Sequence, residues 1–433
     1  MALLKAEWAG WTMRFQPTAR QLITLLTPLL LAGFLWFDGA VPRGFVGTTF
    51  PLLSGGLRVD SVNLAFVLSL ALLFAFGGES RRGLGWVEWL GWLVVVTATD
   101  LPLWTVGWGL ALVSGVARRW SGKVEIRLVL WFLLGVAPLV ALWGTAGEGN
   151  YHEMRQWHLV SGESPVLWLL LWLGVASRLQ VAPLHFLEAR KEENRNSLPW
   201  RLAGVVGALA FLVQTAVGAS PVLAGAVSAP WLALCAWSAL VATGAWSPRR
   251  GHLDVLIGAL GGAAVVAVNR DALLGVNLLV VAGAWFGASA AFGRREVVAR
   301  LAPVGLWIWG GALVLAGMWK EGIAAANGAG WQWRETVLAS TLVLLVAAVL
   351  FTWRWMGVEE SSARTGGWVS SVRRAVWVAV GVLFVMAPGL LIERIDVSVD
   401  RWVQDARQEI TVKRSPESLV EAPSEDPWAF PIE

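Results

Sequence analysis

Long apolar blocks separated by short polar loops dominate the 433-residue chain. Leu, Val, Ala and Gly make up most of these blocks, for example at 21–37, 59–76, 127–143 and 373–392. A helix of about 20 residues crosses the hydrocarbon core of a bilayer, and several blocks approach that length. The blocks lack the apolar–polar alternation of barrel strands, so they indicate membrane-spanning helices. The sequence therefore predicts an all-α, polytopic membrane protein.

The block pattern predicts about thirteen spans, which form a single transmembrane domain over residues 1–392. The predicted spans lie near 21–37, 59–77, 85–99, 102–117, 127–143, 165–183, 199–218, 221–246, 252–269, 271–292, 300–319, 335–355 and 373–392. Pro230 lies within the long span 221–246 and predicts a tilt or a kink there. The polar tail 393–433 carries Pro416, Pro423, Pro427 and Pro431 and is expected to be partly disordered.

The positions of the basic residues predict the orientation of these spans. Arg and Lys gather near the N-terminus and in the loop after every second span, whereas the intervening loops contain few of them. The basic loops contain Arg81 and Arg82; Arg118, Arg119 and Lys123; Arg190, Lys191 and Arg195; Arg249 and Arg250; Arg294, Arg295 and Arg300; and Arg364, Arg373 and Arg374. Because basic loops stay in the cytoplasm, the N-terminus is predicted inside and the tail outside. The predicted location is the inner, cytoplasmic membrane.

Composition agrees with this class of protein and narrows its chemistry. Charged residues make up only 15% of the chain, against about 25% in soluble domains. The basic residues behind the pI of 9.7 lie in short loops between the blocks, so no nucleic-acid partner is expected. One cysteine, Cys235, and four scattered histidines do not support a disulfide, an iron–sulfur cluster, a haem or a zinc site. We therefore expect no cofactor and no metal.

Arg178 is the ionisable residue that lies deepest in a predicted span. It is followed by Pro183 and His185, and a proline at this place predicts a broken helix. An ionisable group is costly in hydrocarbon, so an arginine and a histidine beside such a break are candidates for a proton path. In the alternative interpretation, Arg178 extends towards the cytoplasmic headgroups and His185 lies at the interface.

Other ionisable residues lie at the ends of predicted spans. Asp60 opens the second span, and Asp100 separates the third span from the fourth. Lys320 and Glu321 follow the span 300–319 and are expected at or just inside the outer interface. These four residues are further proton-path candidates, with polar capping of the span ends as the alternative role. Glu88 is interpreted as an interfacial residue, and Asp254 and Asp271 are interpreted as loop residues.

Three stretches together resemble the antiporter-like membrane subunits of respiratory NADH:quinone oxidoreductase (complex I), membrane-bound hydrogenases and Mrp-type cation/proton antiporters. Residues 57–64, LRVDSVNL, are similar to the family's hydrophobic-x-D-G-L-S entry to an early helix. Residues 174–185, GVASRLQVAPLH, follow its first broken helix, G-x-x-x-K-L-P-x-x-P-x-H. Residues 315–323, LAGMWKEGI, are similar to F-A-G-F-x-x-K-[DE]-x-I-L. The resemblance extends from about residue 57 to 355.

The chain departs from the family at the positions where the family carries its charges. Arg178 stands in place of the family's lysine, and Gln180 replaces a proline. The family's early glutamate falls on Trp108-Gly109-Leu110, and its later lysine falls near Ala208. The family's D-x-K-R-x-x-A-Y-S-S region retains only Arg249, Arg250, His252 and Asp254. Arginine holds its proton to a pKa above about 12, so it cannot take over the carrier role of lysine.

The resemblance implies a divergent subunit of a multisubunit, ion-translocating membrane complex with a degenerate proton path. Its implied partners are other polytopic subunits, the lipid bilayer, and protons or monovalent cations. If the complex is an enzyme, the chain would be a non-redox membrane subunit of an NADH:quinone oxidoreductase-like or hydrogenase-like translocase. Two alternatives remain: a stand-alone secondary transporter with its site near Pro183, and a scaffold subunit that moves no ion.

Overall fold

The computed structural model describes residues 45–46, 58–59, 63–76, 84–98, 101–119, 132–146, 164–181, 198–214, 221–243, 253–267, 269–289, 297–325 and 331–356. Nearly all of these residues are helical, as the apolar blocks predict. The exception is one antiparallel strand pair, β1 (Phe45–Val46) with β2 (Arg58–Val59), in which Phe45 pairs with Val59.

The helices of the described residues follow the predicted spans closely. They are α2 (Leu64–Phe76), α3 (Leu84–Thr97), α4 (Leu101–Arg119), η1 (Phe132–Val136), α6 (Ala137–Ala146), α8 (Ser164–Arg178), α10 (Leu198–Val213), α11 (Pro221–Ala242), α12 (Leu253–Ala267), α13 (Arg270–Ser289), α14 (Val297–Ala325) and α15 (Trp331–Met356). Every predicted span from 59–77 to 335–355 coincides with one of them, η1 and α6 together forming one. The spans 21–37 and 373–392 and the tail 393–433 lie outside the described residues.

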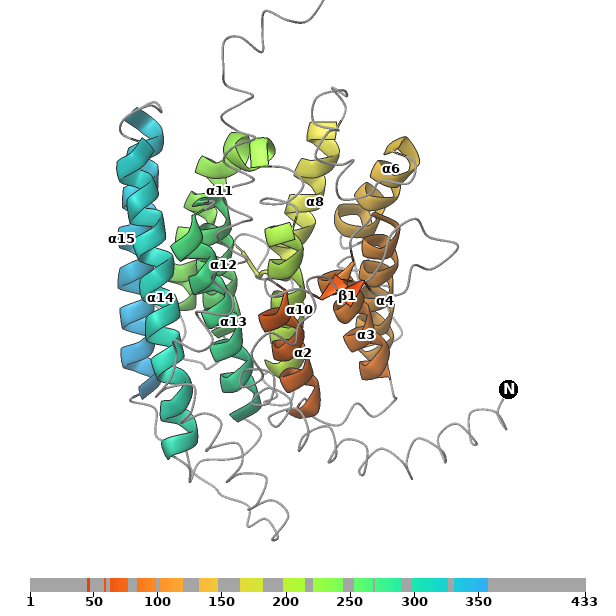
Figure 1. Ribbon diagram of the computed structural model, residues 1–433, viewed down its shortest axis with the longest axis horizontal. Helices are drawn as coiled ribbons and strands as arrows, with labels where there is room; N and C mark the ends of the chain where they lie inside the picture. The colour runs from red at the N-terminus through yellow and green to blue at the C-terminus, as the bar shows by residue number, and fades with distance from the viewer. Residues whose placement is uncertain are drawn as a thin grey trace, which may run out of the picture.

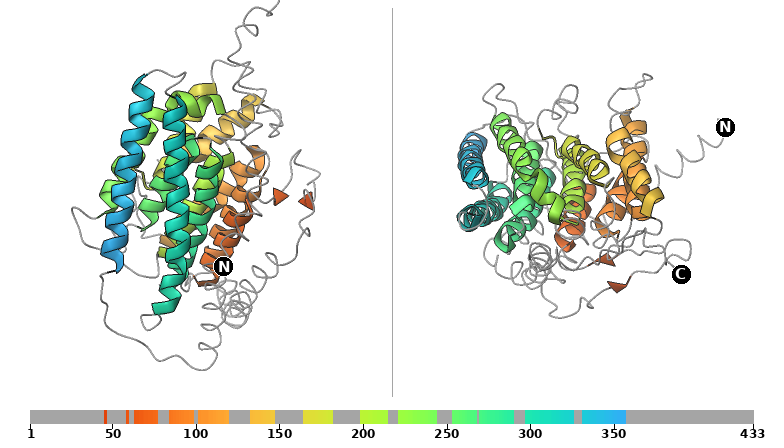
Figure 2. Two further views of the ribbon diagram at one scale, coloured as in Figure 1. Left: turned by 60° about the vertical axis from the view of Figure 1, so that its left-hand side comes forward. Right: turned by 90° about the horizontal axis from the view of Figure 1, so that it is seen from above.

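The helices stand side by side in one bundle (Figures 1 and 2). Helices α14 and α15 form one edge of the bundle in Figure 1, and α3, α4 and α6 form the opposite edge. Between these edges, α10 contacts α2, α3, α8, α12 and α13. Helix α12 packs against α10, α11, α13 and α14. The C-terminal end of α8 and the N-terminal end of α12 lie in the interior of the bundle, where Gln180, just after the first, meets Asp254 of the second.

Small residues allow some helices to touch backbone to backbone. On α13, a Cβ at Gly275 would lie 2.6 Å from the carbonyl oxygen of Gly310 and 2.6 Å from the amide nitrogen of Val314, both on α14. Gly310 also approaches α13 closely, since a Cβ there would lie 3.0 Å from the amide nitrogen of Leu279. Such close packing is typical of helices that associate without a hydrophobic driving force between them.

The outward faces of the peripheral helices carry large apolar side chains. Exposed examples on the described helices are Val106 and Val113 on α4, Phe132 and Leu133 on η1, Trp237 on α11, Ile308, Trp309 and Trp319 on α14, and Leu342 and Val349 on α15. Within the described residues, the windows Arg270–Gly287 and Glu335–Thr352 are long and apolar enough to cross a membrane by themselves. The first window is mostly buried among its neighbours, whereas less than a third of the second is buried.

Candidate functional site

Helix α8 ends at Arg178 in a turn that involves an unusual backbone conformation. The amide of Val181 donates to the carbonyl of Ala176 at 2.9 Å, and the amide of Gln180 donates to the carbonyl of Ser177 at 3.4 Å. This pair of bonds is the Schellman arrangement, which places its C′ residue in the left-handed region and usually uses glycine there. Gln180 occupies that position with a φ of 57°. The left-handed conformation costs a residue with a Cβ about 1 kcal/mol, so another contact must hold Gln180.

The side chain of Gln180 supplies that contact by binding Asp254 at the start of α12. Nε2 of Gln180 donates to Oδ2 of Asp254 at 2.6 Å, and Nε of Arg201, from α10, lies 3.3 Å from the same oxygen. Asp254 is fully buried and Gln180 is almost so. The expectation that Asp254 is a loop residue is therefore wrong. An apolar block does not reveal that its first turn is covered by two other helices.

The backbones of α8 and α12 also touch at this point. Gly258 lies one helical turn after Asp254, on the same face of α12. A Cβ at Gly258 would overlap the carbonyl oxygen of Leu179, in the turn that ends α8. Glycine is therefore required at this position as long as α8 ends at Arg178. The Asp254 carboxylate and the end of α8 are held together by a side-chain contact and a backbone contact one turn apart.

Arg178 is buried, with 5% of its surface exposed, and its side chain lies among other helices. Its guanidinium carbon lies 5.5 Å from the centroid of the Trp92 ring on α3, a cation–π distance. Trp92 in turn contacts Trp108 on α4 edge to face, with the ring centroids 5.2 Å apart. The family's early glutamate falls on the next position, Gly109, of the stretch Trp108-Gly109-Leu110. Trp108 itself supports the ring that lies against Arg178.

Glu88 brings a second carboxylate into the bundle. It is 2% exposed, on the same face of α3 as Trp92 and one turn before it. Neighbouring helices cover Glu88 at this end of α3, and its place at the membrane interface stays a prediction. Two acidic residues, Glu88 and Asp254, thus share the interior of the described bundle with Arg178 and the largely buried Arg201. Their formal charges sum to zero, as expected where ions leave water.

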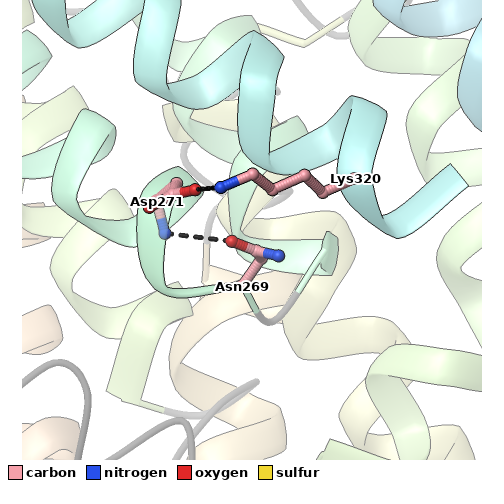
Figure 3. Close-up of polar contacts among 3 residues, drawn as sticks. All are labelled: Asn269, Asp271 and Lys320. Atoms are coloured by element: carbon pink, nitrogen blue, oxygen red, sulfur yellow. Dashed lines mark hydrogen bonds and ion pairs between the residues drawn. The ribbon is translucent and has the colours of Figure 1, made fainter. Parts of the chain in front are cut away.

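A second charged group lies past the other end of α12. Lys320 on α14 forms an ion pair with Asp271 in the first turn of α13 (Figure 3). Asn269 caps this helix, because its Oδ1 accepts a hydrogen bond from the amide of Asp271 at 2.9 Å. The interpretation of Asp271 as a loop residue is wrong, and α14 continues beyond Lys320 and Glu321 to Ala325. The Lys320 side chain is 65% exposed, so this pair is far more open than the Asp254 group.

Four of the predicted site residues lie outside the described part of the chain. They are Asp60, Asp100, Pro183 and His185. Of the predicted site residues that the structure describes, Arg178 is buried against Trp92, and Lys320 pairs with Asp271. Within the described residues, no group of three or more His, Cys, Asp or Glu side chains is arranged to hold a metal ion.

Sequence reasoning missed Glu88, Arg201 and Asp254 as interior charges. Each lies within about one turn of the start of its helix, where a charged residue ordinarily indicates an interface. One signal could have identified Asp254: Gly258 and Gly262 follow it at four-residue spacing, which marks a face of α12 in close contact with a neighbour.

No family model matches the chain, and no curated protein sequence matches it either. Solved structures do match it over most of its length. A chain of respiratory complex I from Thermus thermophilus, solved with bound aureothin, is 18% identical with a TM-score of 0.58, covering 91% of this chain and 98% of that chain. A chain of the Mrp complex from Dietzia sp. DQ12-45-1b is 12% identical with a TM-score of 0.59, covering 94% of this chain and 96% of that chain.

An archaeal complex extends this set. A chain of the membrane-bound sulfane sulfur reductase, an archaeal respiratory membrane complex, is 11% identical with a TM-score of 0.56, covering 86% of this chain and 77% of that chain. At such low identities the likeness establishes a common fold. The three sequence stretches resemble the antiporter-like subunits, and the common fold confirms this resemblance at the level of the fold.

Proposed function

We propose that this chain is a divergent antiporter-like subunit of a multisubunit, proton-translocating membrane complex, with a degenerate proton path. The observation that carries the proposal is a fold shared over most of its length with chains of complex I, an Mrp complex and a respiratory sulfur reductase. The large apolar side chains on the outward faces support a place in the bilayer beside other polytopic subunits.

The interior of the bundle supports a role that involves protons. Charged residues within apolar helices are expensive, and they commonly mark ion or proton pathways. Here Glu88, Arg178, Arg201 and Asp254 lie in the interior, and Asp254 is bound by Gln180 from the turn that ends α8. Arg178, Lys320 and Glu321 belong to the proposed path, as do Asp60, Asp100 and His185, with the helix break at Pro183.

The path is degenerate because charges that the family uses are replaced. The resemblance places a glutamate at Gly109 and a lysine near Ala208, and neither residue carries a charge. Arg178 remains charged at any physiological pH and can fix an electric field but cannot hand on a proton. Proton movement in this chain would therefore depend on its own acidic groups, or on only one half of a channel.

The proposed setting is the inner membrane, with the N-terminus in the cytoplasm and the tail outside. The alternation of basic loops supports this orientation. The chain would bind no redox cofactor of its own, and its polytopic partners would supply the driving reaction or a second path.

Co-purification tests the proposal directly. The tagged full-length chain is extracted in several mild detergents and the intact assembly is weighed by native mass spectrometry. We expect a stable complex with other polytopic subunits, and proton translocation by that complex in sealed vesicles. A monomer or homodimer in every detergent would contradict the proposal. Transport by the isolated chain would indicate a secondary transporter, and a complex that forms but is indifferent to the interior charges would indicate a scaffold.

A further inference from the structure

The interior charges of the described bundle differ in one chemical property. Both cations, Arg178 and Arg201, are arginines, and both anions, Glu88 and Asp254, are carboxylates. A guanidinium keeps its proton at any physiological pH, whereas a carboxylate can gain and lose one. Within this set of four, only the carboxylates can carry a proton.

The geometry distinguishes the two oxygens of Asp254. Oδ2 accepts the hydrogen bond from Gln180 at 2.6 Å and lies 3.3 Å from Nε of Arg201. Oδ1 is buried and accepts no hydrogen bond from any residue that the structure describes. A buried carboxylate oxygen without a donor is costly, and a proton bound to that oxygen removes the charge that makes its burial most costly. Oδ1 is therefore the atom of this group at which a proton would bind.

The helices packed against α12 differ in the charged and titratable groups that they bring near Asp254. Helix α8 presents Gln180 and α10 presents Arg201. The thiol of Cys235, on α11, lies near Gly262, two turns further along α12. Asp271 on α13 and Lys320 on α14 pair with each other past the opposite end of α12, roughly 20 Å away at 1.5 Å per residue. Arg201 is therefore the charged residue among these that faces Asp254 directly.

We propose that Asp254 is the proton-carrying group of this chain, with Arg201 as its fixed counter-charge and Gln180 as a positioning residue. The inference rests on the proposed function and names the group that would act in it. A hydronium ion in the path gives a proton to Oδ1: one O–H bond of the hydronium breaks, one O–H bond forms on Oδ1, water is left, and the carboxylate becomes neutral. The proton later returns to water in the path, and no oxidant or reductant takes part.

Protonation of Asp254 weakens its interactions with Arg201 and Gln180. When Asp254 is protonated, the largely buried guanidinium of Arg201 loses its counter-charge, which is unfavourable in a low-dielectric interior. The hydrogen bond that Gln180 donates also weakens, because its acceptor no longer bears a charge. Release of the proton restores both interactions. The site thus takes up a proton against a restoring force, as a transient carrier must.

Infrared spectroscopy of the full-length chain in lipid nanodiscs tests whether Asp254 takes up a proton. Difference spectra between high and low pH record the carbonyl band of each carboxyl group that becomes protonated. We expect a band that shifts in deuterated water, disappears in Asp254→Asn and moves in Asp254→Glu. Glu88→Gln identifies the contribution of the other buried carboxyl, and Glu335→Gln, which alters an exposed residue of α15, is the matched control.

The spectra also decide against the inference if it is wrong. Identical difference spectra for the native chain and Asp254→Asn would overturn it. Should Asp254→Asn not fold, identical spectra for the native chain and Asp254→Glu would overturn it equally, because a carrier that gains a methylene must change its band.

Translocation by the intact complex provides the second measurement. Asp254→Asn is expected to reduce pH-gradient formation in vesicles at least tenfold, and Asp254→Glu to retain a third or more, both with normal subunit content. Full translocation by Asp254→Asn would overturn the inference while leaving the proposed function intact. If no complex forms at all, the proposed function fails, whereas the infrared band still reports on Asp254.

Discussion

The guanidinium of Arg178 lies 5.5 Å from the centre of the Trp92 ring, inside the bundle. At exposed sites a contact of this kind contributes about 0.5–1 kcal/mol, and desolvation strengthens it. Trp92 in turn contacts Trp108, so two aromatic rings support this buried cation. The interior of this chain therefore combines fixed cations, an aromatic support and two acids.

Substitution of Arg178 separates a fixed charge from a proton carrier. Arg178→Ala removes a buried cation and leaves the interior acids in excess, so complex assembly or pH-gradient formation should fall. Arg178→Lys keeps the charge and introduces a group that can lose a proton, so function should be preserved. The measurement compares gradients formed by the three complexes in vesicles at equal subunit content. Equal gradients for all three would remove Arg178 from the mechanism.

Two substitutions of Gln180 separate backbone strain from the side-chain bond to Asp254. Both Gln180→Gly and Gln180→Ala remove the hydrogen bond, at a cost of about 1–3 kcal/mol for the buried acceptor. Only glycine relieves the left-handed backbone, so the glycine variant should be more stable than the alanine variant by about 1 kcal/mol. Thermal unfolding of the two purified chains, followed by tryptophan fluorescence, measures this difference. A more stable alanine variant would contradict the assigned conformation.

Two glycines at the α13–α14 edge form a matched pair for testing helix packing. Gly275→Ala places a methyl group 2.6 Å from backbone atoms of α14 and should destabilise the chain by about 1–3 kcal/mol. Gly311, on α14, has no atom within 4 Å of its ideal Cβ position. Gly311→Ala should therefore be neutral, or stabilising by up to about 1 kcal/mol through helix propensity. Denaturation of both variants under the same conditions compares their stabilities. An equal loss of stability in the two variants would argue against close contact at Gly275.

The orientation can be tested with single cysteines in a background that carries Cys235→Ala. Ser161 and Ser361 lie outside the described residues, in loops that the basic-residue pattern assigns to opposite sides. A membrane-impermeant thiol reagent added to intact cells should label position 161 and leave position 361 unlabelled. The native chain is the control, since its Cys235 is buried. The reverse labelling would defeat the predicted topology.

The helices could be predicted from sequence because each apolar block has to satisfy its backbone internally in a membrane. The same reasoning could not find the interior charges. Glu88 and Asp254 lie near the starts of apolar blocks, and only the packing of α3 and α12 against other helices buries them. Whether a charge at the end of a helix faces lipid headgroups or protein is decided by contacts between residues far apart in sequence.

The end of α8 shows a second limit of sequence reasoning. Pro183 predicts a break, but α8 already ends at Arg178, and Gln180 occupies a position that favours glycine. No local pattern predicts a glutamine there, because the residue is held by Asp254, 74 positions away. The site's geometry is thus a property of the assembled bundle, whereas the position of Arg178 within a span is visible in the sequence.

The contact between Gly258 and the carbonyl of Leu179 restricts how this sequence can diverge. Position 258 is closed to every residue with a side chain while α8 ends at Arg178. A larger residue could replace Gly258 during evolution only after the end of α8 had moved. Such a move would also release residue 180 from the left-handed conformation. Positions 180 and 258 should therefore covary among orthologues, and glycine should persist at 258 wherever an amide side chain persists at 180.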